Sequence, residues 1–154
     1  MAVVFTDRST VVKRYVQEVG SVWVSGLFTT APANRVVVAA ITRVEVIAAL
    51  TRRVRSGTIT QADAAAACAL FLADMPTDYR SVPITDAVLS QAVQLAQNYK
   101  LRGYDAVQLA AGTEVNQLCL AAGLPPIIFV SADKELNAAA SAEGMTVDDP
   151  NAHP

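Results

Sequence analysis

The chain has 154 residues, 12 of them basic and 14 acidic, so its formal net charge is −2 at pH 7. This length is typical of one domain with its own hydrophobic core, and the charge gives no long-range field that would attract a nucleic acid. The single histidine, His153, is the second residue from the C-terminus. A Ser-His-Asp triad, a pair of catalytic histidines and a histidine-rich zinc site are therefore excluded.

Targeting and membrane signals are absent from the sequence. The N-terminus lacks a basic start followed by a long apolar run, so we expect no signal peptide. The longest uncharged stretch, residues 115–132, contains polar residues and two prolines, which argues against a membrane helix. Cys68 and Cys119 form no C-x-x-C pair and are expected to be buried thiols of a reducing compartment. We therefore expect a cytoplasmic protein that does not contact a membrane.

The N-terminal half predicts two strands separated by helices. Residues 3–5 are an apolar, β-branched run that ends in Thr6 and Asp7, as in a buried strand. Helical spacing over residues 9–17 and 22–28 predicts two short helices, the second closed by a loop at residues 31–34. Residues 36–41 are continuously apolar, which is typical of a parallel strand covered on both faces. A helix follows, and its residues 42–45, Thr-Arg-Val-Glu, match a capping box.

The second half continues the alternation. Thr60 begins a capping box that opens an alanine-rich helix to about Leu72 or Asp74. A short strand is predicted at residues 80–83, and Thr85 caps an amphipathic helix. The remaining expected elements are a helix at 104–120, a strand at 127–130, a helix at 133–141 and a strand at 145–147. This order predicts an α/β fold, three-layer α/β/α with a central, mostly parallel sheet, as one domain over residues 1–148, followed by a polar tail at 149–154 that is expected to fray.

Most acidic residues lie on outward helix faces or in loops of the predicted fold. Four do not: Asp7, Glu45, Asp105 and Asp133. Two follow strands and two lie in the first turns of helices, so all four belong to the C-terminal edge of a parallel sheet. Taken singly, each is explained equally well by helix capping or by the helix dipole. Together they would repel one another unless a cation neutralised them. Oxygen ligands suit Mg²⁺ or Mn²⁺, which can activate water against a phosphodiester without a histidine.

The segments around these acids resemble the motifs of a known family. Residues 5–13, Phe-Thr-Asp-Arg-Ser-Thr-Val-Val-Lys, resemble the opening strand-Asp-Thr-Ser-x-x-x-Lys of the PIN-domain ribonucleases. Residues 42–45, 102–110 and 129–136 are similar to the second, third and fourth motifs of that family. The order and spacing of the four motifs extend the resemblance over nearly the whole chain, and within the family it looks like the VapC-type toxins of bacterial toxin–antitoxin pairs.

The resemblance implies a PIN-like fold and an endoribonuclease that depends on Mg²⁺ or Mn²⁺ and hydrolyses RNA phosphodiester bonds. It implies that Asp7, Glu45, Asp105 and Asp133 are the metal-site carboxylates and that Ser9 supplies a hydroxyl supporting the metal or its water. It also implies a homodimer and a cognate antitoxin protein that inhibits the toxin.

Two residues depart from the family pattern. Arg8 stands where Thr or Ser is usual, and Gln108 where a histidine is frequent. Arg8 has three interpretations: a solvated or salt-bridged residue, a bidentate contact to the scissile phosphate, or a charge that partly replaces the metal and weakens activity. Our hypothesis is that Arg8 and Arg102 bind the substrate. The basic cluster Arg52, Arg53 and Arg55 is explained either by the helix dipole or by contacts to the RNA backbone.

Two other functions are compatible with parts of this pattern. The first is a catalytically weak or inactive PIN-like module that binds RNA or protein, which the departure at Arg8 supports. The second is a phospho-acceptor receiver domain, which also places acids at strand ends. A receiver domain expects a pair of acids at the first strand, whereas here Asp7 stands alone.

Overall fold

A five-stranded parallel sheet runs through the centre of the structure, a computed structural model that describes residues 1–29 and 34–154. The strands lie in the order β3-β2-β1-β4-β5, and every described pairing is parallel. Their bounds are β1 Val3–Thr6, β2 Arg35–Ala39, β3 Tyr79–Val82, β4 Ile128–Val130 and β5 Thr146–Asp148. Apart from Asn34, the loop predicted at residues 31–34 lies outside the described residues.

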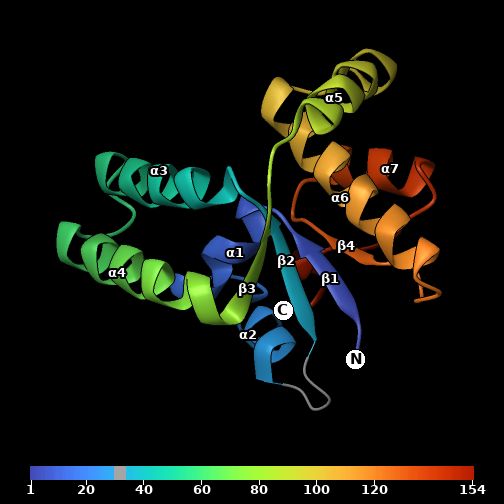
Figure 1. Ribbon diagram of the computed structural model, residues 1–154. Coiled ribbons are helices and arrows are strands. Elements are labelled where there is room, and N and C mark those ends of the chain that lie inside the picture. Colours follow the sequence, from blue (N-terminus) through green and yellow to red (C-terminus); the bar gives the residue numbers. More distant parts are fainter. Residues whose placement is uncertain (30–33) are drawn as a thin grey trace.

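Helices cover both faces of the sheet (Figure 1). One layer consists of α1 Arg8–Tyr15, α2 Ser21–Thr29, α3 Thr42–Arg55 and α4 Gln61–Asp78, and the other of α5 Asp86–Tyr99, α6 Gly103–Ala121 and α7 Lys134–Ala142. Alternate residues of β2 enter opposite cores: Val36 and Val38 pack under the first layer, Val37 and Ala39 under the second. Because both faces are covered, the strand is continuously apolar. The predicted three-layer α/β/α fold is confirmed, with a sheet that is parallel throughout.

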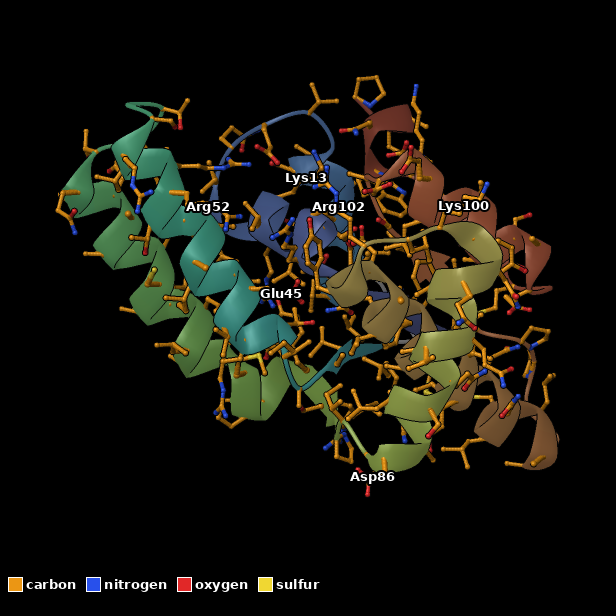
Figure 2. All side chains as sticks on the ribbon, turned by 90° about the horizontal axis from the view of Figure 1, so that it is seen from above. Lys13, Glu45, Arg52, Asp86, Lys100 and Arg102 are labelled. Atoms are coloured by element: carbon orange, nitrogen blue, oxygen red, sulfur yellow. The ribbon has the colours of Figure 1, made fainter. Side chains whose placement is uncertain are left out.

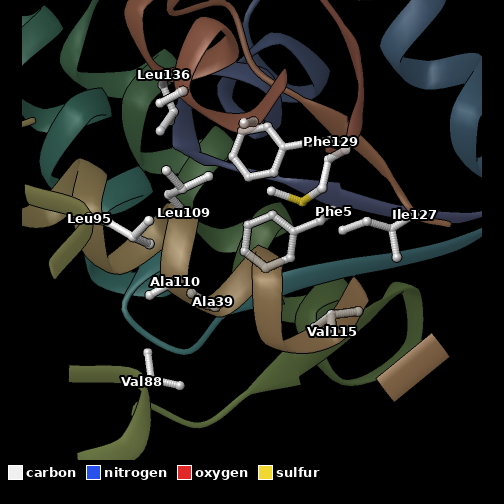
Figure 3. Close-up of a cluster of buried hydrophobic side chains, with 14 of the residues drawn as sticks. Phe5, Ala39, Val88, Leu95, Leu109, Ala110, Val115, Ile127, Phe129 and Leu136 are labelled. Carbon is white, nitrogen blue, oxygen red and sulfur yellow. The ribbon is translucent and has the colours of Figure 1, made fainter. Parts of the chain in front are cut away.

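The core under α6 depends on a close approach of helix and sheet (Figure 3). The rings of Phe5 on β1 and Phe129 on β4 are stacked with their centroids 5.5 Å apart, and both side chains are fully buried. Gly112 of α6 faces these rings. A Cβ atom there would lie 2.9 Å from the Phe129 ring and 3.4 Å from that of Phe5, so only glycine lets the helix pack at this distance.

The start of α3 differs from its prediction. The strand ends at Ala39, Ile41 is the N-cap residue, and no side-chain hydrogen bond caps the helix. The match of residues 42–45 to a capping box therefore does not correspond to a cap in the folded chain. Thr42 already lies inside the helix, and its Oγ1 accepts a hydrogen bond from Gln108 instead of from the backbone. The caps predicted at Thr60 and Thr85 are confirmed, since both hydroxyls accept a backbone N–H three residues later.

Two further expectations fail at the ends of elements. Helix α4 continues to Asp78, through Pro76, because Met75 in its last turn still packs against the core. The last residues do not fray, because Pro150–Ala152 form a 3₁₀ turn with Pro150 buried. The His153 ring stacks on Trp23, with centroids 4.3 Å apart, and its Nε2 is 2.8 Å from an Asp148 carboxylate oxygen. These aromatic and polar contacts hold the C-terminus against α2.

Both cysteines are free thiols; Cys119 is buried, whereas Cys68 is partly exposed. Among the described residues, no helix combines the length and apolar character needed to span a bilayer.

The close packing at Gly112 predicts that Gly112→Ala destabilises the fold by about 1–3 kcal/mol, because the added methyl must displace a buried ring. Urea unfolding measures this change. The control is Gly26→Ala in α2, where the added Cβ has no described atom within 4 Å apart from its chain neighbours and the backbone of its own helix, and the better helix propensity of alanine should stabilise by up to about 1 kcal/mol. Equal stability changes in the two variants would contradict the account of the α6 packing.

Candidate active site

The four predicted carboxylates lie at the edge of the sheet where the strands end. Asp7 directly follows β1 and caps α1, and Asp133 follows β4 and caps α7. Glu45 and Asp105 lie in the first turns of α3 and α6. Figure 2 views the molecule from this side, with Glu45 and Arg102 near its centre, between α3 and α6. The topology thus brings residues from four separate segments to one edge.

Asp7 is the most enclosed of the four, with 4% of its surface exposed. Its Oδ1 accepts hydrogen bonds from the Ser9 hydroxyl (2.6 Å) and the Thr10 N–H (3.3 Å), and its Oδ2 accepts one from the Ser131 hydroxyl (3.0 Å). Burial nevertheless raises the pKa of Asp7 to about 6, and the charge of Glu45 adds to the rise, while the three hydrogen bonds oppose it. Burial therefore outweighs the local hydrogen bonding.

Ser9 and Ser131 connect the ends of β1 and β4. The Ser9 hydroxyl accepts the Ala132 N–H (2.9 Å), and the Ser131 hydroxyl accepts the Asp133 N–H (3.0 Å). Asp133 is positioned in turn by the Leu136 N–H, which donates to its Oδ1 (3.0 Å). Ser131 was not singled out from the sequence, although it stands two residues before Asp133 in the fourth motif. Its spacing from Asp133 was the signal available.

Glu45 and Asp105 are both partly buried. Burial raises the pKa of Asp105 to about 6, and the charges of Asp133 and Asp7 raise it further. Burial also raises the pKa of Glu45, as does the charge of Asp105. Gln108, buried to 1% exposure, donates its Nε2 to Glu45 Oε1 (2.5 Å) and to Thr42 Oγ1 (2.9 Å). The residue that departs from the family pattern thus fixes the Glu45 carboxylate.

Within residues 1–29 and 34–154, none of the four carboxylates forms an ion pair, taken as a nitrogen–oxygen distance of 4.0 Å or less. Arg8 acts on them from farther away, since its charge lowers the pKa values of Glu45 and Asp105. Its guanidinium carbon lies 5.0 Å from the centre of the Tyr104 ring, and Arg102 donates to the Tyr104 hydroxyl (3.0 Å). Tyr104, not singled out from the sequence, thus holds both arginines beside the carboxylates.

The residues present fit a hydrated hard cation better than a metal enclosed by protein ligands. In the part of the chain that the structure describes, no three His, Cys, Asp or Glu side chains are arranged to hold a metal ion. Mg²⁺ needs only one or two carboxylates, because it keeps several of its waters. The donors at this edge are all oxygens, burial raises the pKa values of Asp7, Glu45 and Asp105, and no ion pair among the described residues involves them. Such a set favours Mg²⁺ or Mn²⁺.

The raised pKa values predict an unusual dependence of stability on pH in EDTA. The pKa values of Asp7 and Asp105 are about 6, against 3.8 for the unfolded chain, so ionising these groups costs more in the folded state. Their contribution to the free energy of unfolding is therefore greatest below about pH 4 and is lost as the pH rises through about 6.

Accordingly, Asp105→Asn should match the wild type near pH 3.5 and exceed its stability at pH 7.5. The gain should be on the order of 1 kcal/mol, because solvent screens this half-buried group. Urea unfolding at the two pH values tests this. Asp86→Asn in the first turn of α5, far from Glu45 in Figure 2, is the control and should give no such gain. A loss of stability in Asp105→Asn at pH 7.5 would contradict the predicted repulsion.

No protein-family model matches the sequence, and a search of curated proteins finds no match. Its structure, however, is similar to several solved structures over nearly the whole chain. VapC20 of Mycobacterium tuberculosis, described as a sarcin-ricin loop cleaving toxin, aligns with a TM-score of 0.62 and 19% identity, over 98% of this chain and 99% of that one.

Two assemblies are similar to the same extent. VapBC2 of Rickettsia felis, bound to a DNA fragment from its promoter, aligns with a TM-score of 0.64 and 10% identity, over 96% of this chain and 98% of that one. A toxin–antitoxin complex of Klebsiella pneumoniae gives a TM-score of 0.61 and 16% identity, over 96% and 97% of the two chains. The chain therefore has the fold of the VapC toxins.

Proposed function

We propose that this chain is a metal-dependent endoribonuclease, the toxin of a VapBC-type toxin–antitoxin pair. The observation that carries the proposal is the acidic edge of the sheet, where Asp7, Glu45, Asp105 and Asp133 interact electrostatically and, within the described residues, form no ion pair. Such a set needs a cation at neutral pH. The shared fold supports the proposal, since VapC20 is described as a sarcin-ricin loop cleaving toxin.

In this proposal one or two of Asp7, Glu45, Asp105 and Asp133 bind Mg²⁺ or Mn²⁺ directly, and the others bind it through its waters. When bound, such an ion lowers the pKa of a coordinated water and offsets charge on the phosphate. The protein's own part is to fix the ligand oxygens. Ser9 and Ser131 hold the two oxygens of Asp7, and Gln108 holds one oxygen of Glu45. Ser9 thus supports the site through Asp7.

Arg8 and Arg102 are proposed to bind the scissile phosphate of RNA. Both lie on the side of the cluster that Tyr104 occupies, and their guanidinium groups are suited to paired hydrogen bonds with phosphate oxygens. Tyr104 restricts both side chains before substrate arrives, which lowers the entropy cost of binding.

The proposed partners are a cognate antitoxin and a second copy of the chain. The structural similarity to a toxin–antitoxin complex supports the antitoxin. Leu89 and Val93, one turn apart on α5, are 44% and 60% exposed, which supports a homodimer contact on that helix. We place the protein in the cytoplasm, the compartment that holds its proposed RNA substrate.

A binding module without catalysis is the alternative, and Arg8 is the observation that favours it. Its charge lowers the pKa values of Glu45 and Asp105 and so supplies part of the positive charge that a metal would bring. In that case the chain would bind RNA or protein without cleaving RNA, whether or not Mn²⁺ is present.

The catalytic proposal predicts that Asp7→Asn and Asp105→Asn each reduce RNA cleavage by about two orders of magnitude or more while the far-UV spectrum is unchanged. EDTA should stop cleavage by the wild type, and excess Mn²⁺ should restore it. Asp86→Asn removes a carboxylate outside the cluster and should keep full activity. Cleavage that persists in EDTA would rule out the metal-dependent mechanism.

The proposed substrate contacts predict that Arg8→Ala and Arg102→Ala each lower kcat/KM for RNA about 10-fold or more. Arg→Lys at the same positions should recover only part of the loss, because lysine keeps the charge but not the paired donors. Steady-state cleavage in saturating Mn²⁺ measures these effects. If both alanine variants cleaved RNA at the wild-type rate, the role of these arginines would be abandoned.

A further inference from the structure

A groove of about 470 Å³ lies between α1 and α3, next to the carboxylates. Arg8 and Ser9 line it from the first turn of α1, and Arg52 and Arg53 line it from the last turns of α3. Ser9 also donates to Asp7, and the charge of Arg8 acts on Glu45 and Asp105. The groove therefore begins at the proposed catalytic site and leads away from it along α3.

The charges of this groove favour an anion. Its lining includes four cations, Arg8, Lys13, Arg52 and Arg53, and one acid, Glu18, although the chain as a whole has a net charge of −2. Glu18 accepts from both Lys13 (3.2 Å) and Arg53 (2.8 Å). With one acid against four cations, the lining has a net charge of +3.

Lys13 and Arg53 are held by contacts within the protein, whereas Arg52 faces the solvent. Lys13 is buried and donates also to the Val19 carbonyl and to Asn151, both at 2.9 Å. Arg53 is held by Glu18. Arg52, by contrast, is exposed and forms no ion pair with any described residue. Its guanidinium is therefore available to a ligand.

The position of Arg52 defines which phosphate it can reach. Arg52 follows Glu45 by seven residues on α3, which places it on the same side of the helix, about 10 Å farther along the axis. The Arg52 position therefore suits a different phosphate from the scissile one at the Glu45 end of the helix.

We propose, on the basis of the ribonuclease function above, that this groove binds a phosphate of the RNA backbone next to the scissile one and that Arg52 contacts it. The contact sets the direction in which the strand crosses the site. It adds affinity without reading the base sequence, as phosphate contacts do.

Binding of a fluorescein-labelled oligouridylate, followed by anisotropy in EDTA at several salt concentrations, tests the groove without catalysis. Arg52→Ala should weaken binding roughly 3- to 10-fold and lower the slope of log Kd against log salt by about 0.7. Arg55→Ala removes the same charge from the same helix end but outside the groove lining, and should change both values less. Equal effects of the two variants would overturn the proposal.

Cleavage distinguishes a failure of this proposal from a failure of the ribonuclease assignment. In Mn²⁺, Arg52→Ala should lower kcat/KM on the oligouridylate but not on uridylyl-uridine, which has only the scissile phosphate. Arg52-dependent binding without cleavage by the wild type would overturn the ribonuclease assignment and leave the phosphate groove standing. Wild-type cleavage that Arg52→Ala leaves unchanged on both substrates would overturn the groove alone. If Arg52→Ala lost binding to a poly-glutamate peptide but kept its binding to RNA, the groove would belong to a protein partner, which would contradict the proposal.

Discussion

Burial of Asp7 at the end of β1 is the constraint on which the site depends. Three hydrogen bonds reach its carboxylate, yet the loss of water still raises its pKa to about 6. Two of those donors, Ser9 and Ser131, also accept the backbone N–H groups of Ala132 and Asp133. The same hydroxyls therefore position an acid and join the central strands of the sheet, so that local structure and site chemistry are fixed together.

The carboxylates have different neighbours on their two sides, a buried amide on one and a positive charge on the other. Toward α6, Gln108 holds Glu45 from within the core, and its Oε1 is buried without a described hydrogen-bond partner. Toward α1, Arg8 rests on Tyr104 and supplies positive charge without closing an ion pair. An arginine in this place moderates the repulsion among the acids and is also available to a phosphate. The basic groove continues this side of the site along α3.

Much of the fold could be predicted from the sequence, because the continuous apolar run at residues 36–41 and the alternation of strands and helices are local patterns. The edge location of Asp7, Glu45, Asp105 and Asp133 followed from that topology. The expectations that failed concern residues whose contacts are with residues far away in the sequence. Thr42 bonds to Gln108, 66 residues away, rather than capping its own helix, and His153 is ordered by Trp23. Ser131 and Tyr104 stood within recognised motifs, but their partners are defined only by the folded chain.

The proposed chemistry requires the acidic edge of the sheet to be a cation site. Calorimetric titration of the wild type with Mn²⁺ tests this claim most directly, in buffers of different ionisation enthalpy at pH 6 and pH 7.5. We expect saturable binding at both pH values, with protons released at pH 6, where Asp7 and Asp105 are partly protonated. Binding should be lost in the Asp7→Asn, Asp105→Asn double variant. Absence of Mn²⁺ binding by the wild type, or equal affinity in the double variant, would contradict the account.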